Sequence, residues 1–570
     1  MGHGSQRGKP LCYTFVPMDI SLNALSQEDL APAARPGSKS RRRLAFWAGL
    51  TAVFCLAAFL RFYHLDGYGL WSDEFVTLMI VSADPYHQVL RLCFEIPQPM
   101  PPLYFLLEKA VFDHLIPGEI SLRLLSALAS LLTVLGVFAI GKRLANAEVA
   151  FTAAILCAIN ATQIVYAQNA RPYALCLLLS ALSMICFLDW LKGSSLKSWL
   201  GYLVSTALLV YTHYIFLILP LIQTVHLLLR PLIASDRGID FIRRLRSWTL
   251  MQIALALLCS PLIWPLWRMV QSRQSLNWER RRPGFLDFLM FVDLRAMLGA
   301  LGVMLLFMIG GWLITTRKKK QLRHRPIPGS PNSWTESFSL LFIWAFLPPF
   351  LFFLLFHLTG LNLFVERYLI LSSLPIYLLL PLLALGYFNP LHGRAFLASY
   401  LILYVALVPA HYFIQKREFS PGVPGASEWR ESLGELRQPE YATSLVIFQS
   451  PFIEANGLQY ENYPLLFHYL SSPLNSFYLN SPPRRFVLLP HYWWIQNQAH
   501  FEFKAALRKR LDTEKEFVVF CTQEFWETFS PWLQQGGEGS PEFEVVREFK
   551  SCGALRLIKI SAKLKTLDRS

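Results

Sequence analysis

Residues 44–60 read LAFWAGLTAVFCLAAFL, an uncharged run that directly follows Arg41-Arg42-Arg43. A helix of roughly 17–25 apolar residues is long enough to cross a hydrocarbon layer about 30 Å thick. Further runs of this length recur along the chain, and 54% of its 570 residues are hydrophobic. A single soluble core cannot hide that much apolar surface. The sequence therefore predicts a polytopic α-helical membrane protein.

The lengths of the apolar runs predict about eleven membrane-spanning helices. A polar group, Thr212-His213-Tyr214, favours a turn between two of them, although residues 198–230 could also form one long broken helix. The expected spans are residues 44–60, 119–140, 148–165, 171–190, 198–211, 214–230, 249–270, 297–315, 338–359, 367–387 and 395–414.

The positive charge of the chain lies mostly in short clusters beside these runs, which indicates membrane topology rather than nucleic-acid binding. If the N-terminus is cytoplasmic, the inner loops hold most of the lysine and arginine, and the opposite short loops hold only Arg171 and Arg367. The cluster Arg280-Arg281-Arg282 disagrees, but long loops cross a membrane regardless of charge. An odd number of helices then places the C-terminal region outside. The basic positions of the inner loops are Lys142, Arg143, Lys192, Lys197, Arg243, Arg244, Arg246 and 317–320.

Composition divides the chain into three parts. Residues 1–43 are polar and predict a disordered cytoplasmic tail, and residues 44–414 form the membrane domain. Its external loop, residues 61–118, is rich in aromatic residues and suits amphipathic helices on the membrane surface. Residues 415–570 predict a small external α/β domain. The strands are expected at 444–448, 485–489 and 516–520, and the helices at 428–436 and 501–511.

The polar residues expected on the external side are the candidates for catalysis and for substrate binding. Asp73-Glu74 follows the first span, where a carboxylate close to the bilayer is costly unless it is used. It can act as a general base on a hydroxyl, or it is an ordinary solvated acidic pair. Arg171 lies at the outer end of a predicted span. It either binds a phosphate or extends its guanidinium group from the membrane into the aqueous phase. His213 and the segment 366–368 fall on the same side.

The order of these motifs resembles the GT-C membrane glycosyltransferases, in the bacterial branch related to protein O-mannosyltransferases and to the aminoarabinose transferase of lipid A. The resemblance covers most of residues 44–450, and the Asp-Glu pair is its most specific part. Glu428-Trp429-Arg430-Glu431 resembles the start of the external domain in many bacterial members. The motifs are Arg61, Leu65, Leu70-Trp71-Ser72-Asp73-Glu74, Pro101-Pro102-Leu103-Tyr104, Ala170-Arg171-Pro172-Tyr173 and Arg367-Tyr368.

The resemblance implies an inverting transfer of a hexose or pentose from a polyprenyl-phosphate carrier to an acceptor hydroxyl, on the external face of a bacterial inner membrane. Glycan, lipid and protein acceptors all stay open, the surrounding lipids are further partners, and no nucleic acid is expected. It makes Asp73 the catalytic base. The residues implied to bind or position substrate are Glu74, Tyr104, Arg171, Tyr173, His213, Arg367 and Tyr368.

Two further points follow from the residues. Many members of the family carry histidine where this chain has Met100, so a divalent metal is doubtful and we expect no cofactor. Cys521 and Cys552 could pair if the C-terminal domain is external.

The alternative functions are a transporter or flippase of lipid-linked glycans and a glycan-binding receptor. A transporter should carry charges within its spans and often shows repeated halves. This chain has few such charges, Arg123 among them, and no evident repeat.

Overall fold

The structure is a computed structural model of the whole chain. The residues it describes are 37–193, 195–233, 238–276, 283–284, 334–361, 363–388, 390–407, 426–458, 460, 463–479, 483, 485–535, 541–550 and 555–563. The chain divides into two compact units, Met1–Ala52 and Val53–Ser570. Helix α1 (Gly37–Phe62) runs across the boundary, and all other elements belong to the second unit.

Among the described residues, seven helices are long and apolar enough to span a membrane. An eighth span is obtained if α6 (Ala147–Ile159) and α7 (Ala161–Ala167), which meet at 59°, are counted as one broken helix. The prediction of a polytopic helical membrane protein is therefore confirmed. The helix expected at 297–315 lies outside the described residues.

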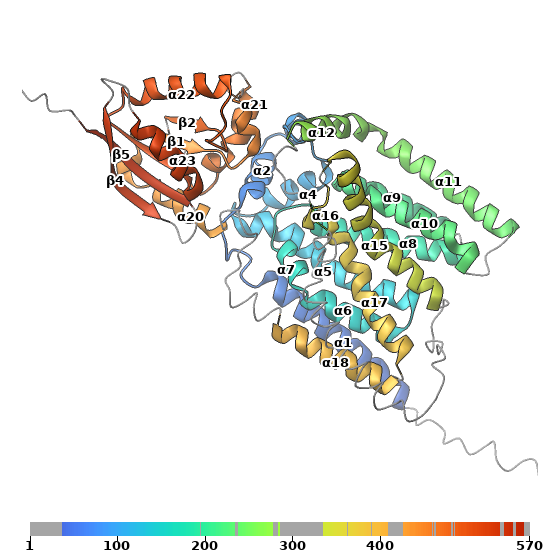
Figure 1. The fold of residues 1–570 in the computed structure, drawn as a ribbon. Helices are drawn as coiled ribbons and strands as arrows, with labels where there is room; N and C mark the ends of the chain where they lie inside the picture. The colour runs from blue at the N-terminus through green and yellow to red at the C-terminus, as the bar shows by residue number, and fades with distance from the viewer. Residues whose placement is uncertain are drawn as a thin grey trace, which may run out of the picture. The chain divides into compact units, whose positions relative to one another are not determined.

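Figure 1 shows the helices of the membrane part, most of which coincide with predicted runs, although α11 begins ten residues before the run expected at 249–270. The turn expected at residue 213 is present, because α9 ends at Thr212 and a 3-10 turn begins at Tyr214. The helices are α5 (Glu119–Leu144), α8 (Tyr173–Gly193), α9 (Leu196–Thr212), η1 (Tyr214–Leu217), α10 (Ile218–Ile233), α11 (Ile239–Cys259), η2 (Ser260–Leu262), α12 (Ile263–Leu276), α15 (Trp334–Thr359), α16 (Glu366–Leu369), η4 (Ile370–Ser372), α17 (Ser373–Tyr387) and α18 (Pro390–Leu407).

Helix α5 lies at the centre of this part and packs against both α6 and α8 (Figure 1). Two glycines allow the close approach. A Cβ added at Gly141 would lie 2.7 Å from the Cα of Ala150 on α6, and one added at Gly136 would lie 2.8 Å from the Cβ of Ala181 on α8. Because lipid tails are as apolar as leucine, membrane helices gain stability from close packing of small residues.

The break between α6 and α7 is held by Arg61. Its Nη1 and Nη2 donate to the carbonyls of Ala158 and Cys157 at 2.9 and 3.0 Å, and its Nε donates to Ser130 at 2.9 Å. These carbonyls are at the end of α6 and lack partners within the helix. In a hydrocarbon layer an unpaired carbonyl is costly, so a buried arginine stabilises the bend.

The loop 61–118 forms three short helices, but the first of them is buried along most of its length and is not the amphipathic surface helix that was expected. They are α2 (Ser72–Val81), α3 (Tyr86–Glu95) and α4 (Leu103–Phe112). Helix α2 has Asp73 and Glu74 in its first turn. Carboxylates are favourable there because the exposed N–H groups leave the helix start partly positive. The polar stretch that predicted a site is therefore the start of a helix.

The C-terminal domain is a five-stranded sheet with the order β2-β1-β3-β5-β4. The three predicted strands coincide with β1 (Leu445–Gln449), β2 (Phe486–Leu489) and β3 (Glu516–Thr522), which are mutually parallel. Two antiparallel strands, β4 (Glu542–Lys550) and β5 (Leu555–Lys563), were not predicted, because charged and apolar residues mix in them. The helices of this domain are α20 (Ala426–Glu435), α21 (Pro464–Leu470), α22 (Gln498–Leu511) and α23 (Gln523–Gln534), and the 3-10 turns are η5 (Pro439–Tyr441), η6 (Ile453–Gly457) and η8 (Ser472–Asn475).

One face of this sheet packs against α22 and α23 around Ile447, Val519, Leu511 and Phe529. Cys521 is a free thiol buried in the same core, and Cys552 lies outside the described residues.

Candidate active site

A cavity of about 220 Å³ lies where α2, the segments 98–101 and 171–173, the turn at 213 and the start of α16 meet. It contains six of the eight residues predicted for the site, namely Asp73, Arg171, Tyr173, His213, Arg367 and Tyr368. The other two, Glu74 and Tyr104, do not line it. Residues separated by almost 300 positions in the sequence thus form one site.

The carboxylate of Asp73 lies between two guanidinium groups. Its Oδ2 is 3.8 Å from Nη2 of Arg171 and 3.8 Å from Nη1 of Arg367. Arg171 also donates to the backbone carbonyl of Asp73 at 3.2 Å. The side chain of Asp73 is 27% exposed, so a substrate can reach it. With two cations and one anion, this triad carries a net positive charge.

Both arginines have spare donors. Among the described residues, the buried Nε of Arg171 and that of Arg367 have no hydrogen-bond partner. Nη2 of Arg171 lies 3.9 Å from the sulfur of Met100, which is a weak acceptor. Burial is the largest influence and lowers the pKa of Arg171, but the Asp73 carboxylate and Tyr173 together outweigh it, so the pKa is raised. Arg171 therefore stays charged, and its fork can bind an anion with oxygen acceptors.

Aromatic rings form the wall beside the arginines. The ring of His213 lies between Tyr173 and Tyr368, with centroids 5.7 and 5.5 Å apart. The guanidinium of Arg367 lies over the Tyr368 ring, 5.5 Å from its centroid. Nδ1 of His213 accepts from the backbone N–H of Ile215 at 3.3 Å, which orients the ring. These contacts hold the guanidinium of Arg367 in place.

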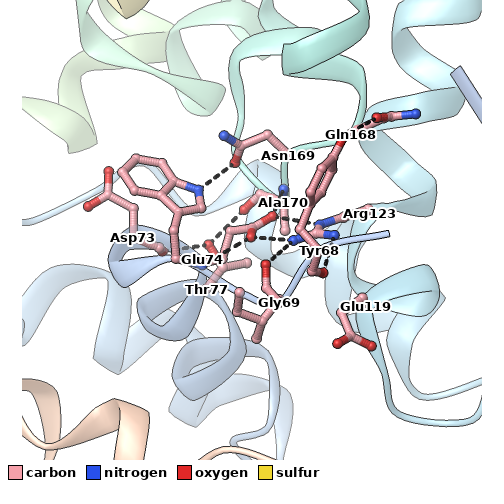
Figure 2. Close-up of polar contacts among 12 residues, drawn as sticks. Tyr68, Gly69, Asp73, Glu74, Thr77, Glu119, Arg123, Gln168, Asn169 and Ala170 are labelled. Carbon is pink, nitrogen blue, oxygen red and sulfur yellow. Dashed lines mark hydrogen bonds and ion pairs between the residues drawn. The ribbon is translucent and has the colours of Figure 1, made fainter. Parts of the chain in front are cut away.

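Glu74 points away from the cavity and into the protein, on the other side of α2 from Asp73 (Figure 2). It forms a two-pronged ion pair with Arg123 of α5, at 2.9 and 2.7 Å. Arg123 also donates to the carbonyls of Leu65, Tyr68 and Gly69 at 2.9–3.0 Å. A buried carboxylate and a buried guanidinium are tolerated when they are paired and their remaining donors are satisfied.

The same pair fixes the segment that carries Arg171. The Oε1 of Glu74 accepts from the backbone N–H of Ala170 at 2.7 Å, and Thr77 donates to the carbonyl of Ala170 at 2.9 Å (Figure 2). The Oδ1 of Asn169 accepts from the indole of Trp71 at 3.3 Å. Helix α2 and residues 169–171 therefore form one rigid piece, which sets the distance between Asp73 and Arg171.

Tyr104 has a similar position behind the site. It is fully buried, and its hydroxyl is 3.1 Å from Oγ of Ser126. Ser126 in turn donates to the carbonyl of Arg171 at 3.2 Å. Tyr104 therefore supports the backbone of Arg171 through Ser126 and does not touch the cavity.

The residues that the C-terminal domain contributes to the cavity were not predicted from the sequence. Glu454 and Tyr469 line it, and the amide of Gln98 donates to Oε1 of Glu454 at 2.5 Å. No local pattern marked Glu454, because it lies in a loop of the sheet domain. Arg123 was seen only as a charge near the start of a span, and its proximity to Glu74 depends on the fold.

In the part of the chain that the structure describes, no group of three His, Cys, Asp or Glu side chains is placed to hold a metal ion. The position of Met100 in the cavity wall is occupied by a thioether, which suits soft metals rather than Mg²⁺ or Mn²⁺.

Comparison with known proteins places this site in a family context. Residues 99–264 match the family model described as dolichyl-phosphate-mannose-protein mannosyltransferase. The fold is similar to that of ArnT from Cupriavidus metallidurans in the apo state, with a TM-score of 0.51 and 11% identity over 91% of this chain and 98% of ArnT. The oligosaccharyltransferase of Archaeoglobus fulgidus has a TM-score of 0.43 and 12% identity, over 87% of this chain and 72% of that one. No curated protein sequence matches the chain.

The membrane fold with its C-terminal sheet domain is of the GT-C type seen in ArnT. Within the membrane part, residues 99–264 are similar to the protein mannosyltransferases that the family model describes. The resemblance seen in the sequence motifs is therefore confirmed.

Proposed function

We propose that the chain transfers a sugar from a polyprenyl-phosphate carrier to an acceptor hydroxyl, with inversion at the anomeric carbon, on the external face of a bacterial inner membrane. The observation that carries this proposal is the accessible carboxylate of Asp73 between Arg171 and Arg367. The matching family model supports the donor class, because its description names a lipid-phosphate mannose.

The geometry supports a single displacement. Asp73 accepts the proton of the acceptor hydroxyl as its oxygen attacks the anomeric carbon. The bond between that carbon and the phosphate oxygen breaks, and its electron pair stays on the phosphate. The lipid phosphate thereby gains one negative charge, which Arg171 and Arg367 stabilise as it develops. Attack from the face opposite the phosphate inverts the anomeric centre.

The cavity also supports a lipid-linked donor over a soluble nucleotide sugar. Tyr173 and Arg367 lie in the first turns of two membrane-spanning helices. A sugar phosphate at this height leaves its polyprenyl chain in the hydrocarbon layer. Purified protein that used a nucleotide sugar directly, with no lipid carrier present, would overturn this part of the proposal.

The test has two stages. Mass spectrometry of glycans and glycolipids from cells with and without the protein identifies the sugar and the acceptor. Purified protein is then supplied with polyprenyl-phosphate hexose or pentose, and transfer is measured against the Asp73→Asn variant. Transfer that is equal in the variant and in the wild type would refute the role of the Asp73 site.

The external position of the site follows from the distribution of basic loops. Reporter fusions after Lys320 and at the C-terminus should report opposite sides of the membrane. The same outcome from both fusions would contradict the proposed orientation.

A further inference from the structure

A second cavity, of about 190 Å³, lies at the carboxyl ends of the parallel strands of the sheet domain. The chain leaves β1, enters β2 on one side of it, and returns to β3 on the other side. The direction of strand order thus reverses between β1 and β3. In open α/β sheets, the crevice outside the strand ends at such a reversal is where ligands bind.

The cavity has aromatic walls. Trp429, Phe448 and Phe520 line it, with ring centroids 5.5–6.2 Å apart. Trp429 also packs edge-on against Phe75 of α2 at 5.6 Å. Apolar rings with a few fixed polar groups are typical of small-molecule sites.

The polar groups of the cavity are neutral and held in place. The amide of Gln449 accepts from the N–H of Thr522 at 2.8 Å and donates to the carbonyl of His491 at 2.8 Å. Nδ1 of His491 lies 3.0 Å from the carbonyl of Ser450, so Nδ1 carries the hydrogen and Nε2 is an acceptor. Burial lowers the pKa of His491, so the ring is neutral at neutral pH. None of the described residues that line this cavity carries a charge.

The second cavity adjoins the first. Ser72 and Pro451 line both of them, and Ser72 directly precedes Asp73. A molecule bound at the strand ends therefore contacts Ser72, the residue that precedes the proposed base Asp73 in the sequence. Most residues that line this second cavity belong to the sheet domain.

We propose that this cavity binds a neutral sugar ring of the acceptor, so that the acceptor is a glycan or the sugar headgroup of a glycolipid. That the bound sugar is the acceptor rests on the proposed function. That the cavity binds a neutral sugar does not. Aromatic faces pack on the C–H faces of a sugar, and Gln449, His491 and Thr522 offer donors and acceptors to its hydroxyls. Among the described residues no cation lines the cavity, so a phosphate there would lack the charged partner that phosphate sites commonly have.

The test is saturation-transfer NMR on the full-length protein in detergent. The probes are neutral methyl hexopyranosides, N-acetylhexosaminides and their disaccharides, with aromatic tripeptides and inorganic phosphate as competing classes. We expect saturation transfer to at least one neutral saccharide. Thr522→Val removes one hydroxyl at constant shape and should weaken that binding about 2–10-fold, the loss of one hydrogen bond. His491→Phe, which removes the Nε2 acceptor, should do the same.

Asn497→Ala is the matched control. Thr522 and Asn497 both cap helices of this domain, accepting from Phe525 at 3.3 Å and from His500 at 2.9 Å, but Asn497 does not line the cavity. Equal effects of Thr522→Val and Asn497→Ala, saturation transfer to no neutral saccharide, or binding of the tripeptides or phosphate alone would each overturn the proposal. If a saccharide binds as expected but no lipid-linked sugar is transferred, the transferase proposal fails and the sugar site stands.

Discussion

Asp73 and Glu74 are adjacent acidic residues, and we expect their amide variants to fail in different ways. The variant Glu74→Gln keeps the size of the side chain but removes its charge. Both oxygens of Glu74 accept from Arg123, and they also accept from the N–H groups of Ala170 and Trp71. A glutamine has one acceptor oxygen, and its NH₂ group would face a guanidinium donor.

The magnitude follows from burial. The side chains of Arg123 and Glu74 are 2% and 1% exposed. Removing one partner of a buried ion pair leaves an uncompensated charge and costs about 3–5 kcal/mol of folding free energy. Asp73 differs, because its contacts to arginine are 3.8 Å long and it is 27% exposed. Loose ion pairs whose carboxylate solvent can reach contribute about 0–1 kcal/mol.

The assay is thermal unfolding of the purified protein in detergent, followed by tryptophan fluorescence. Glu74→Gln should lower the unfolding midpoint clearly. Asp73→Asn should change the free energy of unfolding by no more than about 1 kcal/mol, so its midpoint should stay near that of the wild type. Residual turnover of Glu74→Gln should recover at low temperature, where the fold holds. A variant that is as stable as the wild type and yet inactive at every temperature would refute the positioning role and place Glu74 at the substrate.

Three further predictions concern the site and its surroundings. Asp73→Asn should lower turnover by about 10²–10⁴ while donor affinity persists, and near-normal turnover in folded protein would remove its assignment as the base. Arg171→Ala should weaken donor binding by roughly 10- to 150-fold, measured by titration with the lipid-linked sugar, whereas Arg143→Ala, which breaks a half-exposed pair with Asp189, should not. Burial raises the pKa of Glu108 on α4 well above its ordinary value, so the folded protein holds that proton more tightly than the unfolded chain. Stability linked to the Glu108 proton is therefore present below the ordinary pKa of a glutamate and is lost as the pH rises toward the raised pKa. Glu108→Gln should stabilise the protein more at pH 8 than at pH 5. An equal effect at both pH values would show that Glu108 is not held protonated.

The sequence by itself determined the class of protein and the first part of its sheet domain. The length of an apolar run such as 44–60 is a local property, and a hydrocarbon layer sets the length that a helix needs. The strands β1 and β3 were predicted for the same reason, since short buried parallel strands are continuous apolar runs. Strand β4, with its charged and apolar residues mixed, has no such local mark and is a strand only because it pairs with β5.

The tertiary structure decided which acidic residue faces the cavity. Successive residues on a helix point about 100° apart, so Asp73 and Glu74 must differ, but their sequence does not say which one is buried. The position of Arg123 on α5 decides it, because a guanidinium with three backbone acceptors needs one carboxylate to complete its pairing. The contribution of Glu454 and Pro451 to the cavity could not be predicted from the sequence either. It depends on contacts between loops that lie more than 300 residues apart in the chain.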